Sequence, residues 1–202
     1  MAMRILILYA HPRPSTSIVQ HALSNAAKSI PGVTFHDLYA AYPDFSIDPV
    51  HEQSLLLEHD VIILQHPFYW YSSPAILKEW QDIVLDFGWA YGPDGDKLHG
   101  KFMLQAMSTG GAEGFYHAKG RNRFTIDELL RPFNQTAFLC GMAYLKPFIV
   151  YEGRRISDDV LEGHVTRYRD ILTGLTQDTI KPLKHLADGF TPPANFKAGA
   201  KP

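Results

Sequence analysis

Four short runs of this chain consist almost entirely of β-prone apolar residues and do not alternate apolar with polar positions. They span residues 4–10, 61–66, 102–109 and 144–151, and a weaker fifth run spans 33–38. Strands that are apolar on both faces are buried on both faces, which is what helix-covered parallel sheets require. The runs therefore predict five strands of a parallel sheet with helices on both sides.

Amphipathic stretches between these runs predict the helices. Apolar residues recur at helical spacing within residues 18–30, 74–87 and 160–175. Thr125 and Glu128 can form a capping box at the start of another helix, which Pro132 is expected either to kink or to confine in its regular part. Asp48-Pro49 suits the start of a short helix. Alternating strands and helices predict a doubly wound α/β fold, and five strands favour the flavodoxin-like order 2-1-3-4-5, with a ligand site beyond the carboxyl ends of the strands.

Size and composition limit the classes of function. The 202 residues, 46% hydrophobic and 20% charged, suit one globular domain. We assign it to residues 1–175, because residues 176–202 form a polar, proline-bearing tail without periodicity. The net charge of -2 gives no basic surface for nucleic acid or an anionic membrane, so the expected ligand is small. The single cysteine excludes an intramolecular disulfide, and we expect a cytoplasmic protein because neither a signal peptide nor an apolar run of about 20 residues is found.

The loop after the first predicted strand can form an anion cradle. It brings His11 and the hydroxyl groups of Ser15, Thr16 and Ser17 to the start of the first predicted helix. A helix N-terminus has unpaired amide donors and a partial positive charge, which together favour a phosphate group. The alternative is an ordinary serine or threonine N-cap, since the loop lacks both the G-x-G-x-x-G and the Walker pattern.

The loops after the third and fourth predicted strands carry two further signals. Four consecutive aromatic residues, Phe68 to Tyr71, cannot all turn inward, so some are expected to wall a flat ligand; a roof over the core or a subunit interface is the alternative. Gly110 and Gly111 allow backbone amides to approach the pyrimidine edge of a flavin, although a plain glycine turn is the alternative. Because the fold brings these loops together, phosphate cradle, aromatic wall and glycine amides jointly predict flavin mononucleotide (FMN).

Patterns for other chemistry are incomplete. His51-Glu52 is not followed by the second histidine of a zinc protease, there is no cysteine pair, and no metal site is predicted. The G-x-S-x-G elbow of a serine hydrolase is absent, and Cys140 falls on the apolar side of a helix, as expected for a packed, inert thiol. The basic cluster within residues 119–123 suits either a solvated loop or the phosphates of a nicotinamide dinucleotide.

The same loops resemble the NAD(P)H:quinone oxidoreductase family of flavodoxin-like proteins, and within it the ancillary quinone reductase subunits of glutathione-gated potassium efflux systems (KefF-type). The resemblance covers roughly residues 4–175 and rests on YAHPRPSTS, LYAAYPDFSID, QHPFYWYSSPAILKEWQD, FGWAYGPDGDKLHGK and STGGAEGFY. It implies a noncovalent flavin, FMN with FAD as the alternative, reduction by NADPH or NADH, a quinone acceptor, and a homodimer with both active sites at its interface.

The resemblance also implies three sets of flavin-binding residues. The phosphate would be held by His11, Ser17, Ile18 and Val19. The isoalloxazine would be lined by Pro67, Phe68, Tyr69, Trp70 and Tyr71, with Trp70 and Tyr71 acting largely through backbone donors. The pyrimidine edge would meet Ser108, Thr109, Gly110 and Gly111.

Catalytic and substrate-pocket residues follow from the same resemblance. Tyr116 matches a tyrosine that lies over the flavin and buffers charge during hydride transfer, and Asn122 takes the place of its histidine partner in the mammalian enzymes. Tyr71 completes the implied catalytic set. Tyr91 matches a tyrosine that the second subunit contributes to the pocket rim, where Trp70 and Tyr116 are also expected.

The resulting hypothesis is an NAD(P)H dehydrogenase (quinone) with a two-electron ping-pong reaction. Nicotinamide and quinone would occupy one pocket in turn, and hydride would pass through flavin N5. A first alternative is a flavin-containing regulatory subunit that docks on a membrane potassium-efflux protein and so sits peripherally at the inner membrane. A second is a one-electron carrier of the flavodoxin type, which the aromatic roof favours less.

Overall fold

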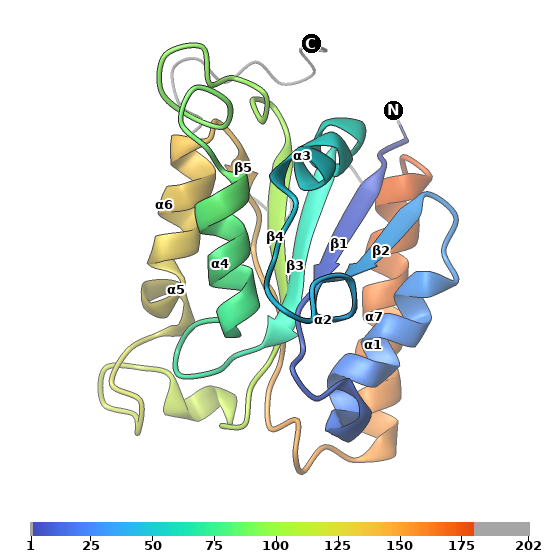
Figure 1. Ribbon diagram of the computed structural model, residues 1–202. Helices are drawn as coiled ribbons and strands as arrows, with labels where there is room; N and C mark the ends of the chain where they lie inside the picture. The colour runs from blue at the N-terminus through green and yellow to red at the C-terminus, as the bar shows by residue number, and fades with distance from the viewer. Residues whose placement is uncertain (1, 180–202) are drawn as a thin grey trace.

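The computed structural model describes residues 2–179, which are built around one parallel sheet (Figure 1). The strands β1 (Ile5–Tyr9), β2 (Val33–Asp37), β3 (Val61–Pro67) and β4 (Phe102–Ser108) lie in the order β2-β1-β3-β4. On the far side of β4, β5 (Ala143–Tyr144) and β6 (Phe148–Val150) both pair with it in parallel. The predicted flavodoxin-like fold and strand order are confirmed.

The fifth predicted strand, residues 144–151, is divided into two pieces. The N–H of Leu145 donates to the carbonyl of Met103 at 2.8 Å, and strand pairing resumes where Phe148 lies opposite Ala106. Pro147, between the pieces, has no N–H to donate and cannot continue the ladder. Both pieces run along β4, so together they fill the fifth position of the sheet.

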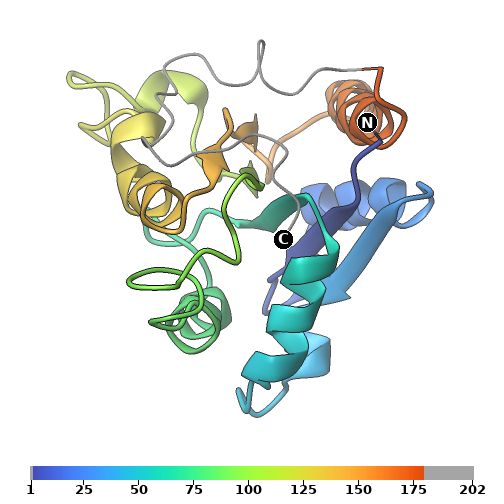
Figure 2. The ribbon, with the colours of Figure 1, turned by 90° about the horizontal axis from the view of Figure 1, so that it is seen from above.

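Helices cover both faces of the sheet, as the end-on view shows (Figure 2). One face is covered by α1 (Ile18–Lys28) and α7 (Asp158–Thr176). The other is covered by α3 (Pro49–Glu58), α4 (Ala75–Val84), α5 (Ile126–Leu129) and α6 (Arg131–Leu139). Three shorter helical turns lie in connections: η1 (Pro14–Thr16), α2 (Leu38–Ala41) and η2 (Glu113–Phe115).

Each face of the sheet has its own hydrophobic core. In β1, Leu6 and Leu8 join the cluster beneath α3 and α4, whereas Ile5 and Ile7 join the cluster beneath α1 and α7. All four side chains are 0% exposed. Successive side chains of a strand point to opposite faces. Burial on both faces is therefore the reason why this run is continuously apolar.

Helix starts follow the predicted local signals. The Asp48 side chain caps α3, and Pro49 lies in the first turn of that helix. Thr125 and Glu128 form the capping box at the start of α5. Of the two effects expected at Pro132, the helix is not kinked but confined: α5 ends at Leu129, and Pro132 lies in the first turn of a new helix, α6, where its missing N–H is not needed.

The C-terminal end of the described chain is helical. Helix α7 continues through Thr176, the first residue of the predicted tail, and residues 180–202 of that tail lie outside the described residues. Within residues 2–179 no helix is long and apolar enough to cross a membrane.

Candidate functional site

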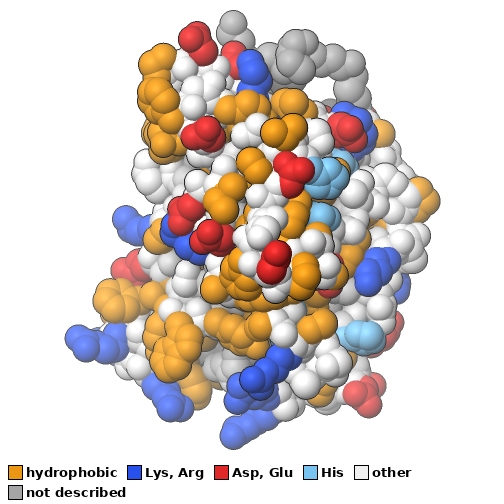
Figure 3. All heavy atoms as spheres, viewed as in Figure 1, with side chains coloured by type: hydrophobic (Ala, Val, Ile, Leu, Met, Phe, Trp, Pro, Cys, Tyr) orange, Lys and Arg blue, Asp and Glu red, His pale blue; other side chains and the backbone are white. Residues whose placement is uncertain are grey.

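A pocket of about 170 Å³ lies at the carboxyl edge of the sheet, and we call it the carboxyl-edge pocket. Its lining comes from segments that follow β1, β3, β4 and β6: His11, Thr16, Ser17, Ile18, Val19, Pro67, Tyr69, Ser108, Thr109, Gly153 and Arg154. The strand register places Pro67 opposite Ser108 and Ser108 opposite Val150, which makes these strand ends neighbours. Basic and hydrophobic side chains gather along this lower edge of the molecule (Figure 3).

The start of α1 offers unpaired backbone donors to this pocket. Ser17 is the N-cap residue, and its hydroxyl accepts the N–H of Gln20 at 3.2 Å. The N–H groups of Ile18 and Val19 have no acceptor within the described part of the chain. Unpaired amides at the positive end of an 11-residue helix favour an anion.

His11 adds an uncharged donor at the same place. Its side chain is 4% exposed, and its Nδ1 atom accepts the N–H of Arg13 at 3.0 Å. Nδ1 therefore carries no proton, which places the proton of the neutral ring on Nε2, and Nε2 has no partner among residues 2–179. Burial lowers the pKa of His11, and the charge of Asp37 only partly opposes this effect. At neutral pH the ring is an N–H donor without charge.

The aromatic loop after β3 contains a strained tight turn. The N–H of Ser72 donates to the carbonyl of Tyr69 at 2.9 Å, and the two central residues, Trp70 and Tyr71, have φ values of 49° and 64°. This conformation favours glycine or asparagine, and large side chains there cost roughly 1–3 kcal/mol each. The N–H groups of Trp70 and Tyr71 have no acceptor in the described part of the chain. The turn therefore holds two free donors at the edge of the sheet.

The aromatic side chains of this loop point in different directions. Phe68 is 9% exposed, and its ring lies 6.3 Å from that of Tyr71 and 6.2 Å from that of Tyr116. Tyr69 lines the carboxyl-edge pocket. Trp70 is 93% exposed and is not among the described residues that line the carboxyl-edge pocket. The expectation that Trp70 lines a ligand therefore depends on its backbone or on a second molecule.

The loop after β4 is tied down by its own hydrogen bonds. The N–H of Thr109 donates to the carbonyl of Val150 at 2.9 Å, and its hydroxyl donates to the carbonyl of Gly111 at 2.8 Å. The N–H groups of Gly110 and Gly111 have no acceptor among the described residues. A Cβ atom on Gly110 would meet no atom within 4 Å, so the space beside this glycine is open.

The three residues of the implied catalytic set are brought together. The hydroxyl of Tyr71 donates to Oδ1 of Asn122 at 3.3 Å, and both tyrosines flank Phe68. A Cβ atom on Gly111 would lie 3.3 Å from the hydroxyl of Tyr116, which places that hydroxyl over the glycine loop. Burial raises the pKa of Tyr116, so its hydroxyl stays protonated at neutral pH.

Comparisons with known proteins agree with this geometry. A family model described as a flavodoxin-like fold matches residues 3–172. An NADPH-quinone reductase from P. pentosaceus is 34% identical, with a TM-score of 0.77 over 85% of this chain and 98% of that one. The chain belongs to the flavodoxin-like NAD(P)H:quinone reductase family. The family resemblance predicted from the loops is confirmed.

Two further relatives of this reductase family extend the comparison. A glutathione-regulated potassium-efflux system ancillary protein KefG from Pectobacterium atrosepticum is 50% identical over 170 residues, which are 84% of this chain and 93% of the relative. The general stress protein 14 of Treponema denticola, whose crystal structure is in complex with FMN, is 38% identical with a TM-score of 0.80. That alignment covers 85% of this chain and 99% of the neighbour.

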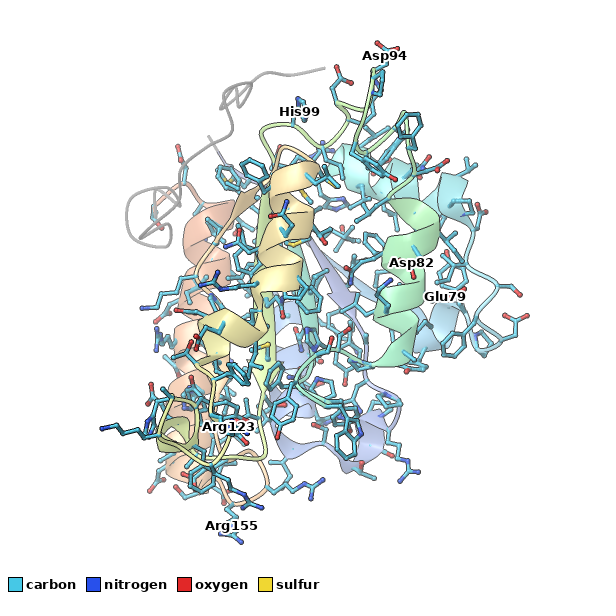
Figure 4. The ribbon with its side chains drawn as sticks, turned by 90° about the vertical axis from the view of Figure 1, so that its left-hand side faces the viewer. Glu79, Asp82, Asp94, His99, Arg123 and Arg155 are labelled. Carbon is cyan, nitrogen blue, oxygen red and sulfur yellow. The ribbon has the colours of Figure 1, made fainter. Side chains whose placement is uncertain are left out.

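Several predicted site residues are not part of the pocket lining in this member of the reductase family: Phe68, Trp70, Tyr71, Gly110, Gly111, Tyr116 and Asn122, which lie in the loops after β3 and β4, and Tyr91. Tyr91 is the one of these that lies in a different part of the fold. It lies in the segment between α4 and β4, where its ring contacts that of Phe87 at a centroid distance of 5.7 Å. Figure 4 shows this segment, with Asp94 and His99, at the opposite end of the fold from Arg123 and Arg155. Within one chain Tyr91 therefore cannot form the rim of the carboxyl-edge pocket.

Arg154 and Gly153 line the pocket although they are not among the predicted binding residues. The segment of Gly153 and Arg154 follows β6, and every segment that follows a strand of a parallel sheet emerges at the same edge. The run Gly153-Arg154-Arg155 after the last predicted strand was therefore a usable signal, and the sequence prediction did not use it.

The structure offers little to hydrolytic or metal chemistry. No group of three or more histidine, cysteine, aspartate or glutamate side chains within residues 2–179 could hold a metal ion. Cys140 at the end of α6 is 1% exposed, and burial raises the pKa of its thiol to about 11. The thiol is therefore packed, as its apolar position in the sequence predicts.

Proposed function

We propose that this chain binds FMN in the carboxyl-edge pocket and acts as an NAD(P)H dehydrogenase (quinone). One observation carries the proposal: at one edge of the sheet, three segments hold pairs of backbone N–H donors that find no acceptor among residues 2–179. The pairs are Ile18 and Val19, Trp70 and Tyr71, and Gly110 and Gly111. A flavin nucleotide has an anionic phosphate at one end and, when reduced, a negatively charged pyrimidine edge at the other. Unpaired donors suit both ends.

The phosphate end fits the start of α1. Five residues with polar groups line the pocket at this end. They are Ile18 and Val19 with their free amides, Thr16 and Ser17 with their hydroxyls, and His11 with its Nε2 proton. The amides, the Ser17 hydroxyl and the His11 ring can each donate a hydrogen bond to the phosphate, whereas the Thr16 hydroxyl already donates to the carbonyl of Arg13 at 3.0 Å. The helix adds a partial positive charge. No carboxylate lines this pocket among the described residues, so an anion meets no like charge there.

The ring end fits the strained turn and the glycine loop. When bound, the flavin supplies the redox chemistry, taking hydride from a reduced nicotinamide dinucleotide and passing it to a quinone. The N–H groups of Trp70 and Tyr71 would bind the polar edge of the ring, and those of Gly110 and Gly111 its pyrimidine side. Donors fixed in place before reaction stabilise negative charge without reorganising, which is what backbone strain at this turn provides.

Tyr116, Tyr71 and Asn122 would orient the substrate above the ring. The raised pKa of Tyr116 keeps a proton on its hydroxyl, which can donate to a developing oxyanion. Asn122 has no titratable proton, and its Oδ1 atom accepts a hydrogen bond from the Tyr71 hydroxyl. The proton that a reduced quinone needs would therefore come from Tyr116 or from solvent.

A visible spectrum of the purified protein tests this proposal. We expect flavin absorption, anaerobic bleaching by NADPH or NADH, and return of the colour on addition of a quinone. Tyr116→Phe should slow turnover moderately and retain flavin, whereas His11→Ala should weaken flavin retention. Protein that binds no FMN at micromolar concentration, or flavin that neither nucleotide reduces, would contradict the proposal.

A second candidate function is an ancillary role beside a membrane potassium-efflux protein on its cytoplasmic side. It is favoured by the 50% identity to relatives named as ancillary proteins of such systems. Trp70 also suits contact with another protein, because it is 93% exposed and lies in a turn where it adopts a positive φ. If the Tyr116→Phe variant still co-purifies with the efflux protein, this role is separate from catalysis. If the Trp70→Ala variant no longer co-purifies, Trp70 is part of the surface that contacts the efflux protein.

A homodimer is the arrangement that would complete the pocket rim. Tyr91 belongs to the segment between α4 and β4, and the labelled Asp94 and His99 of that segment lie at the opposite end of the fold from Arg155 (Figure 4). Only a second copy of the chain can therefore bring Tyr91 to the carboxyl edge. Light scattering should give twice the chain mass. Tyr91→Phe should then alter the Michaelis constant for quinone with little change in flavin affinity, and a monomer in solution would contradict the arrangement.

A further inference from the structure

Permanent charge is scarce in the lining of the carboxyl-edge pocket, although basic side chains gather along the same edge of the molecule outside it (Figure 3). Among the described residues that line it, Arg154 is the only one whose side chain is charged at every physiological pH. His11 is the other candidate cation, but its Nδ1 atom is an acceptor for the N–H of Arg13 at 3.0 Å. The ring is thus neutral in this arrangement. Burial also lowers its pKa below the usual value for histidine, which favours the neutral form at physiological pH.

Backbone contacts fix the place of Arg154. The N–H of Gly153 donates to the carbonyl of Thr109 at 2.9 Å, and the N–H of Glu152 donates to the carbonyl of Gly111 at 3.2 Å. A Cβ atom on Gly153 would lie 3.1 Å from Cγ2 of Val19, so this loop is packed tightly against the first turn of α1. The Arg154 side chain therefore emerges beside the unpaired amides of that turn.

We propose that Arg154 supplies the charge that makes this site select a phosphorylated flavin over the unphosphorylated one, riboflavin. The inference rests on the proposed flavin site. A phosphate monoester carries close to two negative charges at neutral pH, and the amides and the neutral His11 ring balance only part of them. A guanidinium group gives charge-assisted, bidentate hydrogen bonds to phosphate oxygens.

The experiment compares FMN with riboflavin, which has the same ring and ribityl chain without the phosphate. Flavin-free wild-type protein, Arg154→Met and Arg155→Met would be titrated with each flavin. Arg155 is the matched control, because it is the next residue, carries the same charge, does not line the pocket and points away from the fold (Figure 4). Arg154→Met should lose about 10- to 100-fold in FMN affinity and nothing in riboflavin affinity. Arg155→Met should change neither by more than about twofold.

Each remaining outcome is decisive. Equal losses of FMN affinity in the two variants would show general attraction by surface charge and overturn the inference, as would an unchanged FMN affinity in Arg154→Met. Arg154→Lys should recover part of the preference, since it restores charge without the planar group. Wild-type protein that binds both flavins equally would overturn this inference alone, whereas wild-type protein that binds neither would overturn the proposed function.

Discussion

Two of the buried polar clusters within residues 2–179 differ in how completely their groups are paired. In the first, the Glu52 carboxylate accepts hydrogen bonds from His36 Nε2 at 2.7 Å, the Tyr42 hydroxyl at 2.6 Å and Trp80 Nε1 at 2.7 Å. Glu52 is 0% exposed and joins β2, α3 and α4. Every group in this cluster has its partner, and we call it the Glu52 cluster.

The second cluster lies beneath the carboxyl-edge pocket and is incomplete. Gln20 is also 0% exposed, and its Nε2 atom donates to the carbonyl of His66 at 3.0 Å and to the hydroxyl of Ser108 at 3.1 Å. Its Oε1 atom, like Nε2 of Gln105, has no partner among the described residues. Buried groups without partners are rare and call for an explanation, such as a bound ligand or water. The Tyr144 hydroxyl on β5 is a third such group among the described residues, but of the three residues only Gln20 bonds directly to a residue that lines the pocket, Ser108. The comparison teaches that the paired cluster stabilises the fold, while the unpaired one belongs to the site.

Removing the acceptor of the paired cluster should have the largest effect. Glu52→Ala leaves three donors buried without an acceptor, so the free energy of unfolding should fall by about 3–5 kcal/mol. Urea denaturation measures this loss. Glu58→Ala, an exposed glutamate of the same helix, is the control and should cost less than about 0.5 kcal/mol. Flavin affinity of the folded fraction should stay unchanged, and a large loss of affinity in Glu52→Ala would erase the distinction between the clusters.

Acid should weaken the same cluster. Burial acts to raise the pKa of Glu52, but the hydrogen bonds from His36, Tyr42 and Trp80 outweigh it, and the pKa is lowered. The folded state therefore favours the ionised form. This contribution is present above the unfolded-state pKa of about 4.3 and is lost as the pH falls through the lower folded-state value. Unfolding free energies between about pH 6 and pH 2 should show it, and an identical pH dependence in Glu52→Gln would contradict it.

Gln20→Met should give a smaller loss of stability together with a loss of binding. Methionine keeps the length of the side chain but removes both donated hydrogen bonds, which should cost about 1–2 kcal/mol. Because Ser108 lines the pocket, its release should also weaken FMN binding. Gln53→Met is the control, since Gln53 donates to the carbonyl of Val84 at 3.0 Å, away from the pocket. If both variants lose flavin affinity equally, the second cluster has no special link to the site.

The smallest expected effect is a gain in stability. Trp70→Gly should raise the free energy of unfolding by about 0.5–1 kcal/mol, because glycine adopts positive φ without strain and the exposed ring contributes little packing. Trp70→Ala keeps the Cβ atom and hence the strain, so it should show no such gain. Thermal unfolding of the two variants side by side measures the difference, and equal stabilities would mean that the turn stores no strain.

The fold could be predicted wherever burial on both faces leaves a continuous apolar run. This holds for β1, β3 and β4, whose order and parallel pairing also follow from their alternation with helices. It fails at residues 144–151, because apolar character persists through Pro147 while strand pairing does not. Hydrophobicity reports burial, whereas pairing depends on a backbone N–H that only the identity of one residue reveals.

The site was predictable to the level of loops and less so to the level of side chains. His11, Ser17 and Ser108 line the pocket because the topology dictates which strand ends meet. The exposure of Trp70 depends on positive φ values at two successive residues, Trp70 and Tyr71. Aromatic residues rarely adopt positive φ, so nothing in the sequence predicts this turn. The position of Arg154 depends on how closely a glycine packs on α1, which no periodicity encodes.

The packing of Cys140 has a practical consequence for anyone handling this protein. With its pKa raised to about 11, roughly one sulfhydryl in ten thousand is ionised at pH 7. Alkylating reagents such as iodoacetamide should therefore leave the folded chain almost unmodified and label it only when the core opens. The rate at which the alkyl group is incorporated at this single cysteine, measured by mass spectrometry, therefore reports how often the core opens.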